Sequence, residues 1–362
     1  MKILFVFNHP APYKVRLLNE LGKYFDLSVI FERQANKDRE KDFYSEQKYN
    51  FKNIKIKGIK IENENIFSFG IKNHLKKNKY DLVIMNGYST FAEMIAIKYL
   101  KKKKIPYCLY INGGIINKNE SSLKRKIKTY FIKDAAYYFS PDERSNQYLI
   151  YYKANKDKIF NYTYSTIYEK EIKNKLLVKE EIDILKKEKG LNNFKKIFIS
   201  TGQLIKRKNY LNLIKCWSKN DKNLLIIFGK GKQEKTIKKY LKENNITNVK
   251  LMGFANRDIL FSYYSLADAF IFPSKEDIYG HVINEALSQG LPIISTKNVN
   301  SSLKLIKEGY NGYLLDEINE ESISKVLNEI NSIDKENCIR TAKENTIEIM
   351  VKDHIEILKH RL

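Results

Sequence analysis

Short apolar strands alternate with amphipathic helical segments along the chain, and the alternation runs twice. In the first half the apolar segments are residues 2–8, 27–31, 54–61, 81–85, 105–111 and 135–140. In the second half they are residues 196–201, 223–228, 248–252, 269–272 and 291–295. Strands that alternate with helices build parallel sheets with helices on both faces. We therefore predict an α/β fold made of two Rossmann-like, doubly wound domains.

Residues 155–191 interrupt this alternation, because they are polar and rich in Lys and Glu. A chain of 362 residues also exceeds what one hydrophobic core usually serves. The expected boundaries are a first domain at 1–165, a linker at 166–192, a second domain at 193–345 and a C-terminal helix at 346–362. Whether that helix returns to the first domain is left open.

The apolar runs are too short for a membrane span, since the longest, such as residues 224–228 and 3–7, fall far below the ~18 residues needed. Residues 3–7 lead into Asn8 without a small-residue cleavage site, which favours a buried strand of a cytoplasmic protein. The three cysteines are scattered and show no disulfide or zinc spacing. We expect no bound metal and no cofactor.

The formal net charge of +24 would ordinarily indicate a polyanionic partner, such as nucleic acid, anionic lipid or a phosphorylated substrate. Lysines are spread over the whole chain, so part of the excess is interpreted as compositional bias. An anionic membrane surface remains a candidate partner of the basic first domain, with a peripheral location on the inner face of the cytoplasmic membrane as an option.

One basic segment, residues 121–134, carries an apolar stripe at helical spacing. The stripe consists of Leu123, Ile127, Tyr130 and Phe131. Such a stripe most often contacts a core, and we prefer that interpretation to a membrane-facing one.

The loops after the second-half strands contain glycine, basic and acidic residues. Lys206, Arg207 and Lys208 follow the first strand, and the stretch 273–292 runs from an acidic turn into a helix expected near Gly280. Ligands of doubly wound sheets bind at this edge, and a helix N-terminus binds anions. Acids there can accept hydrogen bonds from hydroxyls, so the combination suits a sugar joined to a diphosphate.

Two local observations refine this site. The sequence Gly229-Lys-Gly231 has Glu234 where a dinucleotide fingerprint needs its third glycine, so a nicotinamide cofactor is disfavoured. Glu285 lies on an otherwise apolar helix and needs a partner there, because an unpaired buried charge costs several kcal/mol.

Residues 196–316 resemble the donor-binding domain of family 4 glycosyltransferases of the GT-B fold. The resemblance rests on the glycine–basic loop, the Gly-x-Gly loop, and the acid-x-aromatic-Gly-x-x-x-x-Glu motif that runs from Asp277 to Glu285. It implies two domains that face a central cleft, and metal-independent, retaining transfer of a hexose from a nucleotide-diphosphate sugar such as a UDP-sugar. The implied acceptor is a lipid-linked saccharide or surface polysaccharide, as in lipopolysaccharide or capsule biosynthesis.

The resemblance also assigns roles to donor-side residues. Glu285 would bind the ribose hydroxyls, Lys208 the diphosphate, and either Asp277 or Glu276 the sugar. The family commonly has Glu at position 277 and Arg at position 203, where this chain has Asp and Gln. The expected donor-binding residues are Gly202, Gln203, Arg207, Lys208, Gly229, Gly253, Phe254, Glu276, Asp277, Tyr279, Gly280, His281, Val282 and Glu285.

The first domain would bind the acceptor through loops that follow its strands. The expected acceptor-binding residues are His9, Pro10, Pro12, Tyr13, Tyr88, Gly113 and Gly114. Asn112 lies near the place where related enzymes often carry a His or an acid that faces the donor sugar. The expected catalytic residues are therefore Asn112, Lys208 and Asp277, and none must act as a covalent nucleophile.

Two alternatives remain. A nucleotide-sugar epimerase shares the two-domain plan, although the donor motif resembles the transferases more closely. A basic nucleic-acid-binding protein would fit the charge and the 25 tyrosines, but no zinc, winged or RNP-type motif supports it.

Overall fold

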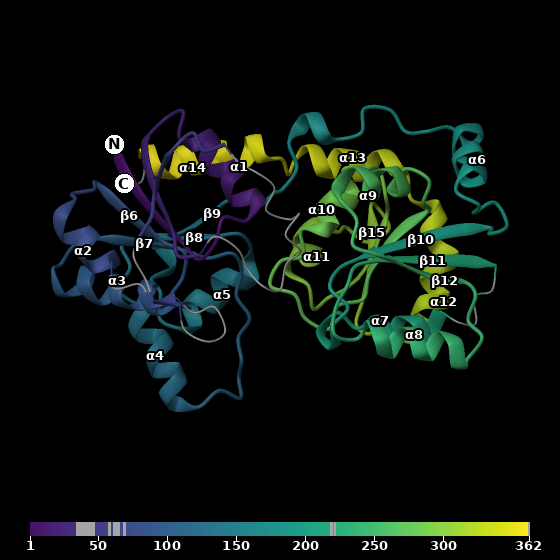
Figure 1. The fold of residues 1–362 in the computed structure, drawn as a ribbon, viewed down its shortest axis with the longest axis horizontal. Coiled ribbons are helices and arrows are strands. Elements are labelled where there is room, and N and C mark those ends of the chain that lie inside the picture. The colour runs from purple at the N-terminus through teal and green to yellow at the C-terminus, as the bar shows by residue number, and fades with distance from the viewer. Residues whose placement is uncertain are drawn as a thin grey trace. The chain divides into compact units, whose positions relative to one another are not determined.

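Two parallel β-sheets, one in each of two structural units, organise the computed structural model of the chain (Figure 1). The structure describes residues 1–33, 48–56, 59–60, 66–67, 70–217, 220 and 222–360. Unit 1 comprises Met1–Thr166 and Ile347–Leu362, and unit 2 comprises Ile167–Thr346. The expected α/β, doubly wound fold class is confirmed.

Unit 1 has a seven-stranded parallel sheet in the order β3-β2-β1-β6-β7-β8-β9. Its strands are β1 (Lys2–Phe7), β2 (Asp26–Phe31), β3 (Lys52–Ile54), β6 (Leu82–Met85), β7 (Tyr107–Tyr110), β8 (Tyr137–Ser140) and β9 (Ile159–Asn161). A separate antiparallel pair joins β4 (Ile59–Lys60) to β5 (Ile66–Phe67). Part of the strand expected at 54–61 lies outside the described residues.

Helices cover both faces of the unit 1 sheet, because its strands are apolar on both sides. One face carries α2 (Gly70–Lys77), α3 (Phe91–Lys102), α4 (Ser122–Ile132) and α5 (Glu143–Tyr151). On the other face α1 (Pro12–Leu21) packs against α14 (Ile347–His360), as Figure 1 shows. Side-chain caps fix several helix starts, including a capping box between Thr90 and Glu93.

Unit 2 has a six-stranded parallel sheet in the order β12-β11-β10-β13-β14-β15. Its strands are β10 (Lys196–Thr201), β11 (Asn223–Phe228), β12 (Val249–Gly253), β13 (Ala269–Phe272), β14 (Ile293–Thr296) and β15 (Gly312–Leu315). Its helices are α6 (Lys179–Glu188), α7 (Tyr210–Trp217), α8 (Glu234–Glu243), α9 (Arg257–Tyr264), α10 (Val282–Leu287), α11 (Asn300–Leu305), α12 (Glu320–Glu329) and α13 (Lys335–Lys343). The single tryptophan, Trp217, is fully buried against Phe198 in this core.

The segment expected as a linker is structured. Residues 167–192 lie within unit 2, where they form a 3₁₀ turn (Glu169–Glu171) and α6. Leu191 is buried in the unit 2 core. The turn is held by contacts distant in sequence, such as the 3.1 Å hydrogen bond from Gln289 Nε2 to Glu171 O. The polar composition of this segment gives no sign of such contacts.

The apolar stripe of α4 differs from the core contact expected for it. Phe131 is buried, whereas Leu123, Ile127 and Tyr130 are 66%, 43% and 41% exposed. The buried residues of this helix, Phe131 and Ile132, lie in its last turn. The core interpretation is therefore wrong for three of the four stripe residues.

None of the helices in the described part of the chain is both long enough and apolar enough to cross a bilayer.

Candidate functional site

The loops after β10, β11 and β12 are in close backbone contact at the carboxyl edge of the unit 2 sheet. Gly202 N donates to Phe228 O at 2.9 Å, and Gly229 N donates to Gly253 O at 2.7 Å. A Cβ atom on Gly229 would lie 1.9 Å from Gly202 O. A side chain at Gly229 would force these two loops apart, so this glycine has a packing role that does not depend on a ligand.

The basic loop after β10 meets the acidic turn after β13. Lys206–Lys208 form a short 3₁₀ turn, and Lys208 Nζ makes an ion pair with Asp277 Oδ2. Arg207 Nη1 donates to Glu276 O at 2.8 Å and lies 3.3 Å from Asp277 Oδ2. The structure thus brings Lys208 and Arg207, from the loop after β10, together with Asp277, from the loop after β13.

Asp277 and Lys208 are largely buried, whereas Arg207 is 40% exposed. Burial alone would raise the pKa of Asp277, but Lys208, Arg207 and the Tyr279 amide together hold that pKa below its ordinary value. Asp277 is therefore ionised at neutral pH and suited to accept hydrogen bonds. The main-chain carbonyl of the neighbouring Glu276 accepts hydrogen bonds from Arg207 Nη1 and Ser274 Oγ.

The helix after the acidic turn begins later than expected. It spans Val282–Leu287, and Gly280 before it has φ +91°, which an L side chain rarely adopts. Asp277 Oδ1 accepts a 3.2 Å hydrogen bond from Tyr279 N. Ser301 Oγ donates to Gly280 O at 3.0 Å. The Asp277 side chain thus stabilises the turn that precedes the helix.

Glu285 has the partner that its position on an apolar helix requires. Arg257 Nη2 donates to Glu285 Oε1 at 2.9 Å, and Arg257 Nη1 donates to Glu171 Oε1 at 3.1 Å. Burial alone would lower the pKa of Arg257, but the two carboxylates raise it above its ordinary value. Sequence reasoning missed Arg257 and Glu171. The only available signal was the need of Glu285 for a cation.

The remaining donor-side residues lie around these loops. Tyr279 and His281 have ring centroids 5.0 Å apart, and Phe254 is 39% exposed just after β12. Gln203 accepts a 2.9 Å hydrogen bond from Ile205 N through its main-chain carbonyl. Val282 packs against the unit 2 core.

At the carboxyl edge of the unit 1 sheet, Asn112 after β7 lies beside Asn86 after β6. Asn112 Nδ2 donates to Asn86 Oδ1 at 3.1 Å. Asn112 Oδ1 is buried, and it has no hydrogen-bond partner among the described residues. A buried acceptor of this kind suits a hydroxyl or amide donor from a ligand.

The other residues expected to bind the acceptor have mainly structural contacts. Pro12 occupies the first turn of α1, and Pro10 just before it is buried. The Tyr13 ring packs edge-on against Tyr164, with centroids 5.7 Å apart. His9 N donates to Asn8 Oδ1 at 2.8 Å.

Tyr88 and Gly114, the second glycine after Asn112, share one neighbour, Tyr148. The hydroxyls of Tyr88 and Tyr148 are 2.5 Å apart. Gly113 has φ +141°, and a Cβ on Gly114 would lie 2.5 Å from Tyr148 Cγ. Gly114 N donates to Ser145 Oγ at 3.1 Å. The absence of a side chain at Gly114 allows the loop to pack directly on the Tyr148 ring.

Sequence reasoning also missed a buried charged cluster in unit 1. Lys14 Nζ donates to Asn8 Oδ1 at 2.9 Å, and Thr90 Oγ1 donates to Glu32 Oε1 at 2.6 Å. Glu93, which caps α3, is fully buried nearby in the same electrostatic cluster. Burial lowers the pKa of Lys14 to about 7 and raises that of Glu32 to about 8. Spacing along the sequence gives no signal for this cluster, because its members come from three elements.

No group of three or more His, Cys, Asp or Glu side chains is arranged to hold a metal ion within the described ranges.

Comparison with known proteins finds similarity to glycosyltransferases. Residues 181–345 match the family model described as glycosyl transferases group 1. An uncharacterized glycosyltransferase of Methanocaldococcus jannaschii is 26% identical over 296 residues, covering 80% of this chain and 75% of its own length. A Campylobacter jejuni relative, N-acetylgalactosamine-N,N'-diacetylbacillosaminyl-diphospho-undecaprenol 4-alpha-N-acetylgalactosaminyltransferase, is 27% identical over 171 residues, 46% of each protein.

Solved structures show the same fold over the whole chain. HepE of Anabaena in complex with UDP has a TM-score of 0.79 at 15% identity, with 99% of each chain covered. WaaG, a glycosyltransferase involved in lipopolysaccharide biosynthesis, has a TM-score of 0.72 at 14% identity, covering 99% of this chain and all of its own. The family match in unit 2 and the fold of both units support a glycosyltransferase with the GT-B fold.

Proposed function

We propose that the chain is a retaining, family 4 type glycosyltransferase that transfers a hexose from a nucleotide-diphosphate sugar. The observation that carries the proposal is the convergence of Lys208 and Arg207 on Asp277 at the carboxyl edge of the unit 2 sheet. One edge thereby offers cations for a diphosphate and an ionised acid for sugar hydroxyls. Glu285, oriented by Arg257, is the proposed ribose acceptor.

The chemistry follows from charge development during transfer. When the bond between the sugar and the diphosphate breaks, negative charge grows on the leaving phosphate. We propose that Lys208 and Arg207 stabilise that charge and that no metal is required. Activity that persists in the presence of a chelator would support this, and loss that Mg²⁺ restores would contradict it.

The donor and acceptor classes are proposed from similar proteins. HepE has been solved with UDP-glucose, at 16% identity and a TM-score of 0.76, which supports a UDP-sugar as the first donor to test. The Campylobacter relative is named for a diphospho-undecaprenol substrate. We propose a lipid-linked saccharide as acceptor, with unit 1 as the acceptor-binding unit and Asn112 as one of its contacts. A peripheral position at the inner face of the cytoplasmic membrane follows from such an acceptor.

Calorimetric titration with a panel of nucleoside diphosphates and their sugars tests the donor side. We expect one nucleotide to bind to the wild-type protein, and binding to weaken by at least tenfold in Glu285→Ala and Lys208→Ala. Release of nucleoside diphosphate that depends on added acceptor indicates transfer. Conversion of the nucleotide sugar without acceptor would instead indicate epimerisation, and unchanged binding in both variants would contradict the proposed site.

A further inference from the structure

A basic hollow lies at the amino-terminal edge of the unit 1 sheet, opposite to the edge that carries Asn86 and Asn112. Its volume is about 550 Å³. Its lining includes Tyr107 at the start of β7 and residues just before β8 and β9. Because β7, β8 and β9 are parallel neighbours, their amino ends meet at one edge. The basic hollow is therefore separate from the residues expected to bind the acceptor.

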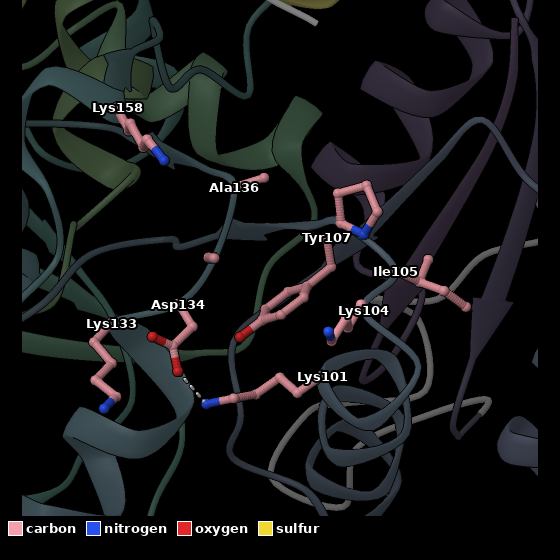
Figure 2. Close-up of a pocket in the computed structure, with 10 residues that line it drawn as sticks. Lys101, Lys104, Ile105, Tyr107, Lys133, Asp134, Ala136 and Lys158 are labelled. Atoms are coloured by element: carbon pink, nitrogen blue, oxygen red, sulfur yellow. Dashed lines mark ion pairs between the residues drawn. The ribbon is translucent and has the colours of Figure 1, made fainter.

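The basic hollow carries a surplus of positive charge. Its charged lining residues are Lys101, Lys104, Lys133, Lys158 and Asp134. Four ammonium groups against one carboxylate leave three charges in excess. Figure 2 shows the ion pair of Lys101 with Asp134, at 2.6 Å, and Lys158 on the opposite side of the hollow in this view. Such a lining favours an anion with several oxygen atoms, such as a phosphate group.

Lys104 has a backbone conformation that is unusual for lysine. Its φ of +56° is in the left-handed region that glycine adopts more readily at the end of a helix. The run of lysines at residues 101–104 stands at the end of α3, where cations complement the helix dipole. The structure shows that two members of that run also line the basic hollow.

The α4 face, defined as Leu123, Ile127 and Tyr130, continues from the basic hollow. Lys101 Nζ donates to Tyr130 O at 2.6 Å and lies 3.8 Å from the centre of the Tyr130 ring. Lys133, which caps the end of α4, lines the basic hollow. The apolar face therefore adjoins the basic lining.

Basic side chains also flank the α4 face along the helix. Lys124 and Lys126 are exposed and lie three and four residues from Ile127 and Tyr130. A helix with exposed apolar residues on one side and lysines beside them is typical of a segment that lies in the interface of an anionic bilayer.

We propose that the basic hollow and the α4 face form one docking surface for an anionic phospholipid bilayer. The lysines of the basic hollow bind headgroup phosphates, and Leu123 and Ile127 enter the interfacial region. A free phosphate would satisfy the basic hollow but gives no reason for the exposed apolar face beside it. The inference rests on the proposed lipid-linked acceptor only for its biological purpose, because vesicle binding requires neither donor nor acceptor.

Sedimentation with phosphatidylcholine vesicles, with and without phosphatidylglycerol, tests the proposal. We expect the wild-type protein to bind only the vesicles that contain phosphatidylglycerol. The hollow variant, K104E/K133E/K158E, and the face variant, L123Q/I127Q, should each bind about tenfold more weakly. The matched control is K235E/K239E/K242E on α8 of unit 2, which makes the same charge change on exposed lysines. Far-UV circular dichroism confirms that each variant is folded.

Several results would overturn the proposal. Equal losses in the hollow variant and the α8 control would show that net charge alone drives binding. If the hollow and face variants both bound vesicles as well as the wild-type protein, this surface would not be the docking surface. Inorganic phosphate that stabilises the wild-type protein but not the hollow variant, without vesicle binding, would indicate a site for free phosphate. Nucleotide binding by the same variants is measured separately, so failure of this surface is distinguishable from failure of the proposed transfer reaction.

Discussion

Arg257 donates a 2.9 Å hydrogen bond to Glu285, and the same guanidinium donates to Glu171 at 3.1 Å. Arg257 begins α9, Glu285 lies on α10, and Glu171 belongs to the turn that precedes α6. A single cation therefore ties the segment that enters unit 2 to the helix of the proposed ribose contact. The planar fork of arginine suits two carboxylates better than an ammonium group does.

Removal of this cation should destabilise unit 2. Arg257→Ala leaves two partly buried carboxylates without their shared partner. We expect a loss of about 2 kcal/mol, less than the roughly 3–5 kcal/mol of a fully buried pair because Arg257 is 28% exposed. Urea unfolding followed by the fluorescence of Trp217, which lies in unit 2, measures the change.

A second comparison separates stability from positioning. Glu171→Gln keeps the shape of the turn and leaves the Arg257–Glu285 contact in place, so nucleotide affinity should change by less than about threefold. Arg257→Lys keeps the charge but not the fork, and should weaken nucleotide binding about tenfold. Equal affinities in Arg257→Lys and the wild-type protein would show that Arg257 does not position Glu285.

Substitutions of Lys208 and of Asp277 should change the affinity for a nucleoside diphosphate in opposite directions. Asp277 neutralises Lys208 in the structure, so a bound diphosphate must compete with this carboxylate for the ammonium group. Lys208→Ala should weaken binding of nucleoside diphosphate about tenfold, or about 1.4 kcal/mol. Asp277→Asn should tighten that binding about threefold while it lowers the turnover of the nucleotide sugar. Calorimetry and a turnover assay on the same variants measure both quantities.

Arg207→Ala provides the internal control for this pair. Arg207 also contacts Asp277 but is 40% exposed. Solvent weakens the electrostatic interactions of an exposed charge. Its loss should weaken binding less than the loss of Lys208. The proposed role of Lys208 would be wrong if the order of the two variants were reversed.

The sequence predicts the parallel strands of unit 2 well, because each is an apolar run bounded by turn residues. The strands expected at 196–201, 223–228 and 269–272 have these bounds in the structure. β9 (Ile159–Asn161) and β15 (Gly312–Leu315) were missed. Both are short edge strands that exist through pairing with one neighbour, and pairing partners are not visible in a local pattern.

The residues of the candidate site also divide into those that belong to local motifs and those that depend on tertiary packing. Lys208 and Asp277 could be predicted because each belongs to a recognisable motif. Arg257 could not, since its contact with Glu285 depends on how α9 and α10 pack. The exposure of Leu123 and Ile127 was likewise unpredictable, because helical spacing shows that residues share a face but not what covers it.

Two glycines at the carboxyl edge of unit 2 should respond differently to alanine. A Cβ on Gly229 would collide with Gly202 O, and its φ of +145° is unfavourable for alanine, so Gly229→Ala should cost about 3 kcal/mol. Gly253 has φ +73° but no atom within 4 Å of an added Cβ, so Gly253→Ala should cost about 1 kcal/mol. Urea unfolding followed by Trp217 fluorescence compares them. Equal losses would show that the close approach of the loops is not the cause.

The buried charges of unit 1 predict how stability depends on pH. The pKa of Glu32 is raised from 4.5 to about 8, so the folded protein holds a proton that the unfolded chain releases between these values. Stability from this group therefore falls as pH rises from about 4.5 to 8. The pKa of Lys14 is lowered from 10.5 to about 7, so its contribution rises with pH between about 7 and 10.5. Glu93 and Arg33 face both groups and modify these limits.

Glu32→Gln isolates the first of these effects. The amide keeps an acceptor for the Thr90 hydroxyl but cannot ionise, so the variant should gain stability relative to the wild-type protein as pH rises from about 4.5 to 8. Urea unfolding followed by far-UV circular dichroism measures this difference, and Trp217 fluorescence identifies the transition of unit 2. Glu143→Gln, at an exposed acid of the same unit, is the matched control and should show a much smaller trend. A parallel pH dependence in Glu32→Gln and wild type would mean that Glu32 is ionised in the folded protein at neutral pH, with Lys14 as its counterion.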